Sequence, residues 1–189
     1  MRLISRKSVV LLLFFVSLSS AAWSQGALPG SIDVAGALTV NGQTGLDGSK
    51  HIGLGLSGAY NRWGKLSALG EFEAQSLGST IALRQSIEVV GAGPRYYFAT
   101  KKRAALYLVG TGGLAHFNTN QVGLPKNSGQ FGAYFGAGGG ADIYVTEDIG
   151  IRPELRYQEA MVGQPSQFGA VQGSIGIYFR IGGEAKKKK

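Results

Sequence analysis

Cysteine is absent from the 189 residues of this sequence, which excludes disulfide bonds, thiol catalysis and cysteine-ligated metal sites. Histidine is almost as scarce. His51 and His116 are the only two, and they do not have the local spacing of a metal-binding pair. We therefore expect no bound metal and no cofactor.

Long apolar runs are also missing after the first 24 residues, so no transmembrane helix is expected in the remainder. The one apolar run, residues 9–18, is too short to cross a bilayer as a helix, which takes about 20 residues. It follows a basic segment (residues 2–7) and precedes the small-x-small sequence AWS (residues 22–24), as in a secretory signal peptide. We predict that residues 1–24 are removed and that the mature chain begins at Gln25. An N-terminal membrane anchor is the alternative.

A basic patch on the folded body is missing as well, although the formal net charge is +8. Three of the positive charges lie in the predicted signal peptide, and four more form the terminal run of residues 186–189. The body between them is close to neutral. A nucleic-acid surface needs clustered Lys and Arg with base-reading or stacking groups, so no nucleic-acid partner is expected.

Helical periodicity is absent from the mature chain, and strict alternation takes its place. In residues 171–181, aliphatic and aromatic side chains alternate with polar or charged ones, and residues 151–161 repeat the pattern. Because successive strand side chains point to opposite faces, each run has one apolar and one polar face. Six further runs precede these two, at about residues 31–40, 51–61, 65–75, 87–99, 104–117 and 131–146. The facing of run 104–117 is the least clear.

The order of the runs predicts how the sheet closes. Longer loops (residues 41–50, 76–86, 118–130 and 163–169) alternate with short turns, as in transmembrane barrels with long outer loops and short periplasmic turns. An even number of strands closes without an exposed edge, and the 31 glycines suit a narrow lumen. The sequence predicts an all-β fold, an eight-stranded antiparallel up-and-down transmembrane β-barrel over residues 25–183, followed by a Lys-rich tail (residues 184–189).

Several segments resemble small bacterial outer-membrane proteins of the OmpA-like β-barrel family. They are GPRYYF (residues 93–98), GGGAD (138–142), IRPELRY (151–157), GSIGIYF (173–179) and YNRW (60–63), the last resembling a first periplasmic turn. The resemblance implies passage through the periplasm with chaperones and insertion by the barrel-assembly machinery through a C-terminal strand signal ending in an aromatic residue. In this chain Phe179 is followed by ten further residues, a departure from that signal.

The polar face carries charges of both signs in comparable number. They are Glu71, Glu73, Arg95, Asp142, Arg152, Glu154, Arg156 and Arg180. Buried charges must pair, and an eight-stranded barrel is just wide enough for its own side chains to fill it. We therefore predict a lumen closed by an ion-pair network. Re-pairing of these charges could instead form a narrow channel for small solutes.

Other candidate sites are weaker. The segment GLGLSG (residues 53–58) matches a dinucleotide-binding fingerprint, but it lies inside a strand with no following helix, so we interpret its glycines as small lumen residues. Glu71 and Glu73 have the spacing of a glycosidase carboxylate pair, without any sign of a substrate cleft. A lipid-A-modifying enzyme would use His51 or His116, but neither has a serine two residues on.

Aromatic residues gather near the ends of the runs, as in interfacial girdles. They are Tyr60, Trp63, Tyr96, Phe98, Phe131 and Phe179. We therefore predict a non-enzymatic, monomeric protein of the bacterial outer membrane, with a structural, envelope-integrity or surface-interaction role and contacts to outer-membrane lipids and lipopolysaccharide. A soluble, lipocalin-like secreted binder, with the aliphatic face inside, is a further alternative that alternation alone does not exclude.

Overall fold

The computed structural model describes residues 28–43, 50–79, 83–101, 103–121, 128–162 and 167–183. The predicted signal peptide (residues 1–24) and the Lys-rich tail (residues 184–189) lie outside the described residues. Among the described residues, no helix is long and apolar enough to cross a membrane.

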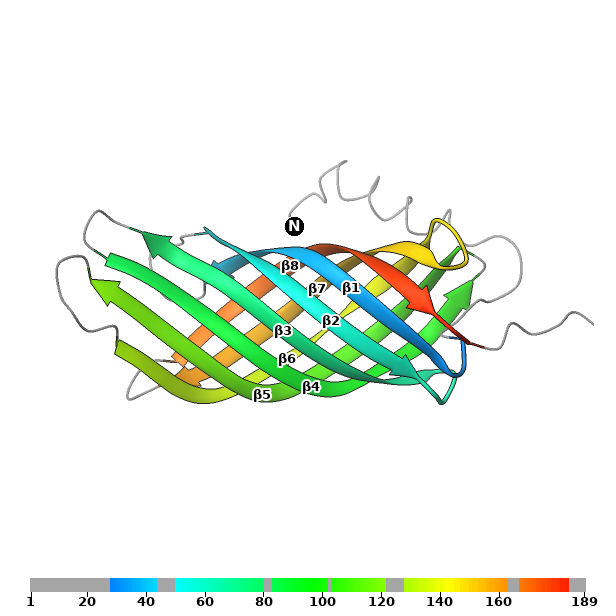
Figure 1. The fold of residues 1–189 in the computed structure, drawn as a ribbon, viewed down its shortest axis with the longest axis horizontal. Helices are drawn as coiled ribbons and strands as arrows, with labels where there is room; N and C mark the ends of the chain where they lie inside the picture. Colours follow the sequence, from blue (N-terminus) through cyan, green and yellow to red (C-terminus); the bar gives the residue numbers. More distant parts are fainter. Residues whose placement is uncertain are drawn as a thin grey trace, which may run out of the picture.

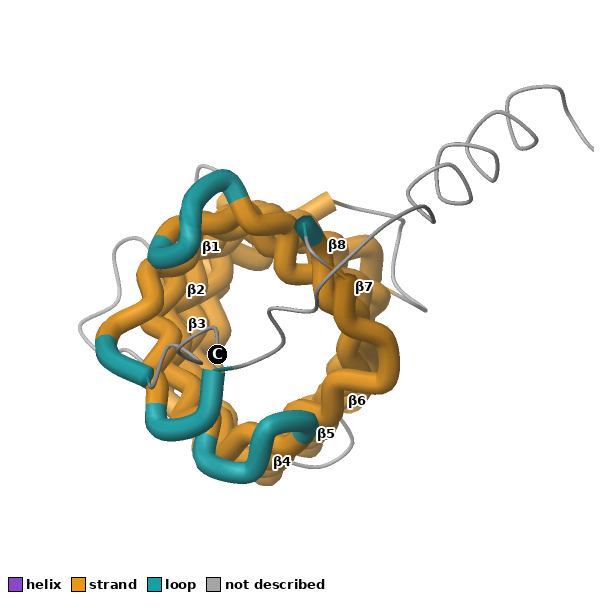
Figure 2. Tube along the Cα trace, turned by 90° about the vertical axis from the view of Figure 1, so that its right-hand side faces the viewer, coloured by secondary structure: helices purple, strands orange, loops and turns teal. Residues whose placement is uncertain are grey.

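Eight antiparallel strands form a closed barrel in which each strand pairs with its neighbours in sequence and β8 returns to β1 (Figures 1 and 2). The strands are β1 (Ser31–Gln43), β2 (Lys50–Asn61), β3 (Leu66–Ser79), β4 (Leu83–Lys101), β5 (Ala104–Gln121), β6 (Ser128–Tyr144), β7 (Ile149–Val162) and β8 (Gln167–Ile181). The predicted fold class is confirmed. Closure leaves no unpaired strand edge along the sheet.

The alternation in sequence corresponds to inside and outside. Along β7, Arg152, Arg156 and Gln158 are buried in the lumen, whereas Leu155 and Tyr157 are exposed on the outer surface. Inward and outward side chains alternate around the whole barrel, which fixes the facing of β5, where Tyr107 and Val109 point inward. At the loop ends of β4 and β5 the inward residues are apolar, while Glu88 and His116 face outward. The lipocalin-like alternative is therefore wrong, because it required the aliphatic face to be inside.

The strands extend further into the predicted loops than the sequence indicated. β3 continues to Ser79 and β4 begins at Leu83, so most of the expected loop 76–86 is strand. Likewise, β5 continues to Gln121 and β6 begins at Ser128, inside the expected loop 118–130. The polar residues of these segments pair across the sheet. The difference in loop length between the two barrel ends is smaller than predicted.

The short turns match their expected positions. Between β2 and β3, Gly64 adopts a positive φ of 69°, which glycine tolerates without a Cβ clash. Between β6 and β7, the Thr146 hydroxyl accepts hydrogen bonds from the amides of Asp148 (3.3 Å) and Ile149 (3.0 Å). These turns lie at the barrel end where β1 begins and β8 ends, called here the short-turn end.

Glycines on the inner wall make room for inward tyrosines. A Cβ on Gly150 would overlap the ring of Tyr178 directly across the sheet, and a Cβ on Gly140 would crowd the hydroxyl of Tyr107. Gly91 lies in the same way beside Tyr134. The abundance of glycine in this barrel is thus tied to the large aromatic side chains that fill its lumen.

Candidate functional site: the closed lumen

The eight charged residues predicted to face the lumen all lie on the inward face of their strands. Glu71 and Glu73 come from β3, Arg95 from β4, Asp142 from β6, Arg152, Glu154 and Arg156 from β7, and Arg180 from β8. Their side chains are buried or nearly so. Such groups are costly to remove from water unless they are paired or hydrogen-bonded, so their partners decide what the lumen can do.

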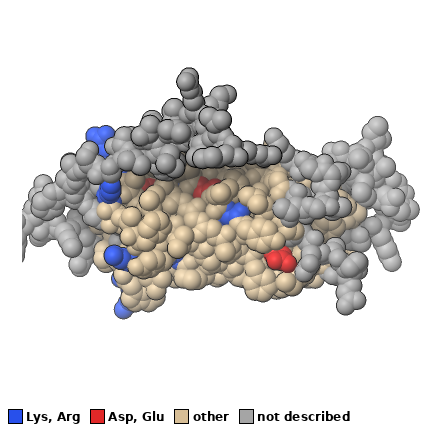
Figure 3. Space-filling model, turned by 180° about the vertical axis from the view of Figure 1, so that it is seen from behind, with Lys and Arg blue, Asp and Glu red and all other residues tan. Residues whose placement is uncertain are grey.

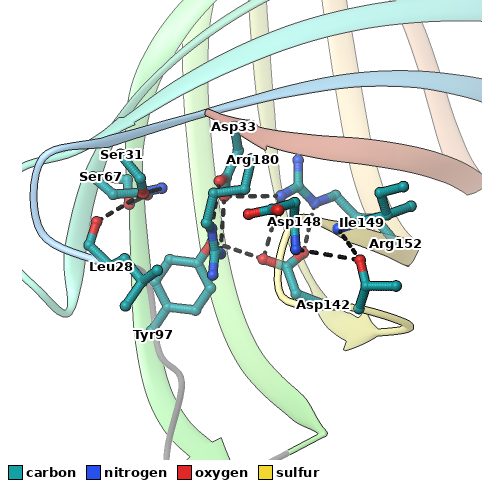
Figure 4. Close-up of polar contacts among 12 residues, drawn as sticks. Leu28, Ser31, Asp33, Ser67, Tyr97, Asp142, Asp148, Ile149, Arg152 and Arg180 are labelled. Carbon is teal, nitrogen blue, oxygen red and sulfur yellow. Dashed lines mark hydrogen bonds and ion pairs between the residues drawn. The ribbon is translucent and has the colours of Figure 1, made fainter. Parts of the chain in front are cut away.

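At the short-turn end, two guanidiniums and two carboxylates form a continuous chain (Figure 4). The Arg180 Nε–H donates to Asp33 Oδ1 at 2.9 Å, and Arg152 Nη2 lies 3.6 Å from Asp33 Oδ2. Arg152 also binds Asp142 in a bidentate manner, through Nε at 2.6 Å and Nη2 at 3.2 Å. The Tyr97 hydroxyl donates to Asp142 Oδ2 at 2.8 Å. This Asp33–Arg180–Arg152–Asp142 cluster joins β1, β6, β7 and β8.

A second group occupies the middle of the lumen. Arg156 Nη1 donates to Glu71 Oε2 at 2.5 Å across the barrel, and Arg156 also pairs with Glu154 on its own strand. Each carboxylate has a second donor: the Tyr134 hydroxyl for Glu71 at 3.2 Å and the Tyr107 hydroxyl for Glu154 at 2.6 Å. The two carboxylates therefore flank one guanidinium, with hydroxyl donors satisfying further oxygen lone pairs.

Glu73 lies apart from the guanidiniums and is held by three amides. Gln75 donates to it at 2.9 Å and Gln158 at 3.1 Å, and the Gln172 side chain completes the set. Glu71 and Glu73 thus have different hydrogen-bond partners, although both line the same small cavity. Arg95 is the opposite case: it forms no ion pair with any described residue and lies over the ring of Tyr107, 4.7 Å from its centroid.

Toward the opposite end, apolar side chains of β4 to β8 fill one side of the lumen, whereas Asn41, His51 and Gln75 are buried on β1 to β3. The buried apolar cluster, called here the loop-end cluster, consists of Ile87, Val89, Ala115, Tyr134, Ala160, Val162 and Ala170. A cavity of about 50 Å³ remains near the middle, between the small side chains of β1, β2 and β8 and the charged groups. A space of this size holds a few water molecules, and it does not form an open pore.

Sequence reasoning missed several members of the network. Asp33 falls on the polar side of the predicted run 31–40 but is not among the predicted lumen charges, although it binds both Arg180 and Arg152. Tyr97 was overlooked as well, although it lies two residues after Arg95 and so on the same face. Tyr107 lies on the strand whose facing was unclear. The alternation of side chains therefore indicates that Asp33 and Tyr97 face inward. It does not indicate which side chains pair across the barrel.

The six predicted girdle aromatics all lie on the outer surface and are exposed: Tyr60, Trp63, Tyr96, Phe98, Phe131 and Phe179. Phe131 is at the loop end, where it stacks on His116 with ring centroids 4.3 Å apart. The other five lie toward the short-turn end. Their arrangement near both rims agrees with the aromatic belts of membrane barrels, a role that stays a prediction.

The histidines lie on different faces. His51 is buried in the lumen, and His116 is on the outer surface, where its Nδ1 is 3.6 Å from Glu88 and 3.3 Å from the Asn118 amide. Within the described ranges, no cluster of three or more His, Cys, Asp or Glu side chains is arranged to hold a metal ion. Gly53 and Gly55 lie inside strand β2, not in a turn before a helix.

Comparisons with known proteins place the architecture in a class. No protein-family model and no curated protein matches the chain. Among solved structures, the fold is that of small bacterial outer-membrane barrels, as expected from the resemblance in sequence.

Neisserial surface protein A (NspA) is 17% identical, with a TM-score of 0.66 over 79% of this chain and 95% of that one. Ail, the attachment invasion locus protein of Yersinia pestis, is 15% identical, with a TM-score of 0.54 over 82% and 100%. The N-terminal β-barrel domain of Pseudomonas aeruginosa OprF is 16% identical, with a TM-score of 0.52 over 82% and 99%. At these identities the likeness shows the fold alone.

Proposed function

We propose that this chain is a non-enzymatic bacterial outer-membrane protein whose barrel serves a structural, envelope-integrity or surface-interaction role, with its lumen closed by ion pairs. The observation that carries this proposal is the band of exposed aliphatic and aromatic side chains on the outer surface, with most of the charges of the strands buried inside. Leu54, Leu155 and Ile175 are exposed on the outer surface, Leu54 by 65%. An apolar band around a closed barrel is what a lipid bilayer solvates.

A closed lumen supports a role other than transport. The Asp33–Arg180–Arg152–Asp142 cluster and the Arg156 group cross the interior, and the loop-end cluster with buried polar side chains fills the other end. Passage of a solute would require several buried ion pairs to separate together, which is costly in a low-dielectric interior. Contacts with outer-membrane lipids, lipopolysaccharide and the barrel-assembly machinery, and the monomeric state, remain predictions of the same proposal.

Fractionation of a Gram-negative host that expresses the chain tests the location. We expect the protein in the outer-membrane fraction, with faster gel migration before boiling than after, because a folded barrel resists detergent. Leu54→Arg places a charge in the middle of the lipid-facing band and costs about 2–4 kcal/mol, whereas Ile181→Arg at the strand end costs about 0–1 kcal/mol. Leu54→Arg should therefore lose most of the heat-shifted band, and Ile181→Arg should keep it.

Planar-bilayer recording tests the closed lumen on the same purified protein. We expect no resolved single-channel openings. Regular openings would favour the narrow-channel alternative, and a soluble periplasmic protein would overturn the membrane location.

A further inference from the structure

The rim at the short-turn end carries a group of exposed cations on one side of the barrel. Arg62 and Lys65 lie in the turn between β2 and β3, and Lys101 and Arg103 lie at the turn between β4 and β5. All four side chains are exposed. In Figure 3, Lys and Arg side chains gather at one end of the barrel, whereas the band along its length is largely uncharged.

The sheet register holds the two basic turns next to each other. The Tyr97 amide donates to the Lys65 carbonyl at 2.7 Å, which fixes the first turn against β4. β4 then continues past β3 to Lys101, four residues beyond Tyr97, or about 13 Å at the rise of a strand. The second turn is fixed from its other side, because the Tyr144 amide donates to the Arg103 carbonyl at 2.9 Å.

Three outward aromatic side chains accompany these cations. Trp63 lies in the first turn and is 60% exposed, and Tyr96 and Phe98 are exposed by 46% and 49% on β4 between the two turns. Aromatic side chains of this kind prefer the depth of lipid headgroups, where an apolar ring meets a polar boundary. The cations therefore lie at the level where lipid phosphates would be found.

No carboxylate of the described residues neutralises this surface. Asp33 and Asp142, the acidic residues nearest this end on β1 and β6, point into the lumen and bind Arg152. The exposed acids of this rim, Glu147 and Asp148, belong to the next turn along the rim, between β6 and β7, and form no ion pair with these four cations. The positive charge on the β2–β5 side is thus directed outward and is free to attract an external anion.

We propose that Arg62, Lys65, Lys101 and Arg103, with Trp63, Tyr96 and Phe98, form a docking surface for the headgroups of anionic phospholipids in the leaflet at this end. The inference rests on the proposed membrane location and adds a preferred lipid class to it. Cations near an anionic lipid surface each add attraction, and several on one side would raise the local ratio of anionic to neutral lipid by about threefold to tenfold.

Trp63 permits a direct test, because the sequence contains only one other tryptophan, Trp23, in the predicted signal peptide. The full chain with Trp23→Phe is reconstituted in vesicles of 70% phosphatidylcholine and 30% phosphatidylglycerol. In one sample the phosphatidylglycerol is brominated, and in the other the phosphatidylcholine is brominated. The ratio of the two quenching efficiencies reports which lipid lies against Trp63. We expect the local ratio of phosphatidylglycerol to phosphatidylcholine around Trp63 to exceed the bulk ratio by about threefold or more, and this excess to fall with added salt.

The variant Arg62→Gln, Lys65→Gln, Lys101→Gln, Arg103→Gln should bring the ratio back to the bulk composition. The matched control, Glu147→Gln with Asp148→Asn, alters the charge of the same rim away from Trp63 and should preserve the excess. The docking surface would be overturned if Trp63 in the unaltered protein reported the bulk ratio of the two lipids, or if the excess of phosphatidylglycerol persisted in the fourfold variant. Either result would leave the membrane barrel intact. If neither brominated lipid quenched Trp63 and the protein also gave no heat-shifted band, the membrane location itself would be overturned.

Discussion

Two buried clusters of opposite chemistry fill different parts of the lumen within one barrel. Neither end is purely charged or purely apolar, because Leu69 and Ala105 are buried at the short-turn end and Asn41 and His51 at the loop end. Toward the short-turn end, Asp33, Asp142, Arg152 and Arg180 form a buried cluster of charges. Toward the loop end, the cluster around Ile87 packs aliphatic side chains and alanines. The same eight strands enclose both, so the difference comes from inward side chains alone.

This difference separates two contributions to the fold. Burial of aliphatic side chains stabilises a fold without requiring a particular partner. A buried ion pair gives little net stability over apolar residues of the same size, but an unpaired charge is strongly destabilising. Asp33 and Arg180 lie directly opposite each other on β1 and β8, the pair of strands that closes the barrel. We infer that the charged cluster specifies the closing register and that the buried apolar clusters supply stability.

The largest effect is expected from Arg152→Met. Arg152 joins Asp33 to Asp142, so its loss leaves two buried carboxylates with fewer donors. We expect a loss of about 3–5 kcal/mol in the free energy of unfolding. Urea titration of the barrel in lipid vesicles, followed by Trp63 fluorescence, measures it.

A combined variant separates the pairing from the volume of the side chain. Arg152→Met together with Asp33→Asn and Asp142→Asn removes the unpaired charges while retaining similar side-chain sizes. Most of the lost stability should return. If the combined variant is no more stable than Arg152→Met alone, the cost arises from packing and the proposed role of the charges is wrong.

In the loop-end cluster, Ile87→Ala should act through lost burial. Ile87 is buried within the loop-end cluster, and truncation of such a side chain costs about 2–5 kcal/mol. Ile87→Val, the matched control, should cost only about 0.5–1.5 kcal/mol. The same urea titration reports both. Equal costs for the two variants would show that the cluster is loosely packed.

A smaller effect is expected where glycine accommodates an aromatic ring. Gly150→Ala introduces a methyl group into the ring of Tyr178 on the neighbouring strand and should cost about 1–3 kcal/mol. In a Tyr178→Ala background the space is open, so the same substitution should cost much less. A double-mutant cycle with no coupling between positions 150 and 178 would contradict this account.

Alternation predicted the inner and outer faces because the side-chain period of a strand is a local property. It placed Arg152 and Arg156 inside from their own strand alone. It did not reveal that Arg156 reaches Glu71 across the barrel, because that contact depends on strand stagger and lumen width. The ends of the strands were misjudged for a similar reason: polar residues near Ser79 and Gln121 resemble a loop in sequence but pair with neighbouring strands.

Tyr134 joins the loop-end cluster to the charged groups in the middle of the lumen, so it gives the finest test of the comparison. Its ring belongs to the loop-end cluster, and its hydroxyl donates to Glu71 at 3.2 Å. Tyr134→Phe keeps the ring and removes the donor, while Arg156 still pairs with that carboxylate. We expect a loss of about 1 kcal/mol, typical of one hydrogen bond. Tyr134→Leu also removes ring packing and should cost more. If Tyr134→Phe and Tyr134→Leu lose the same free energy of unfolding, the hydroxyl alone accounts for the contribution of Tyr134. The ring would then add nothing to the loop-end cluster.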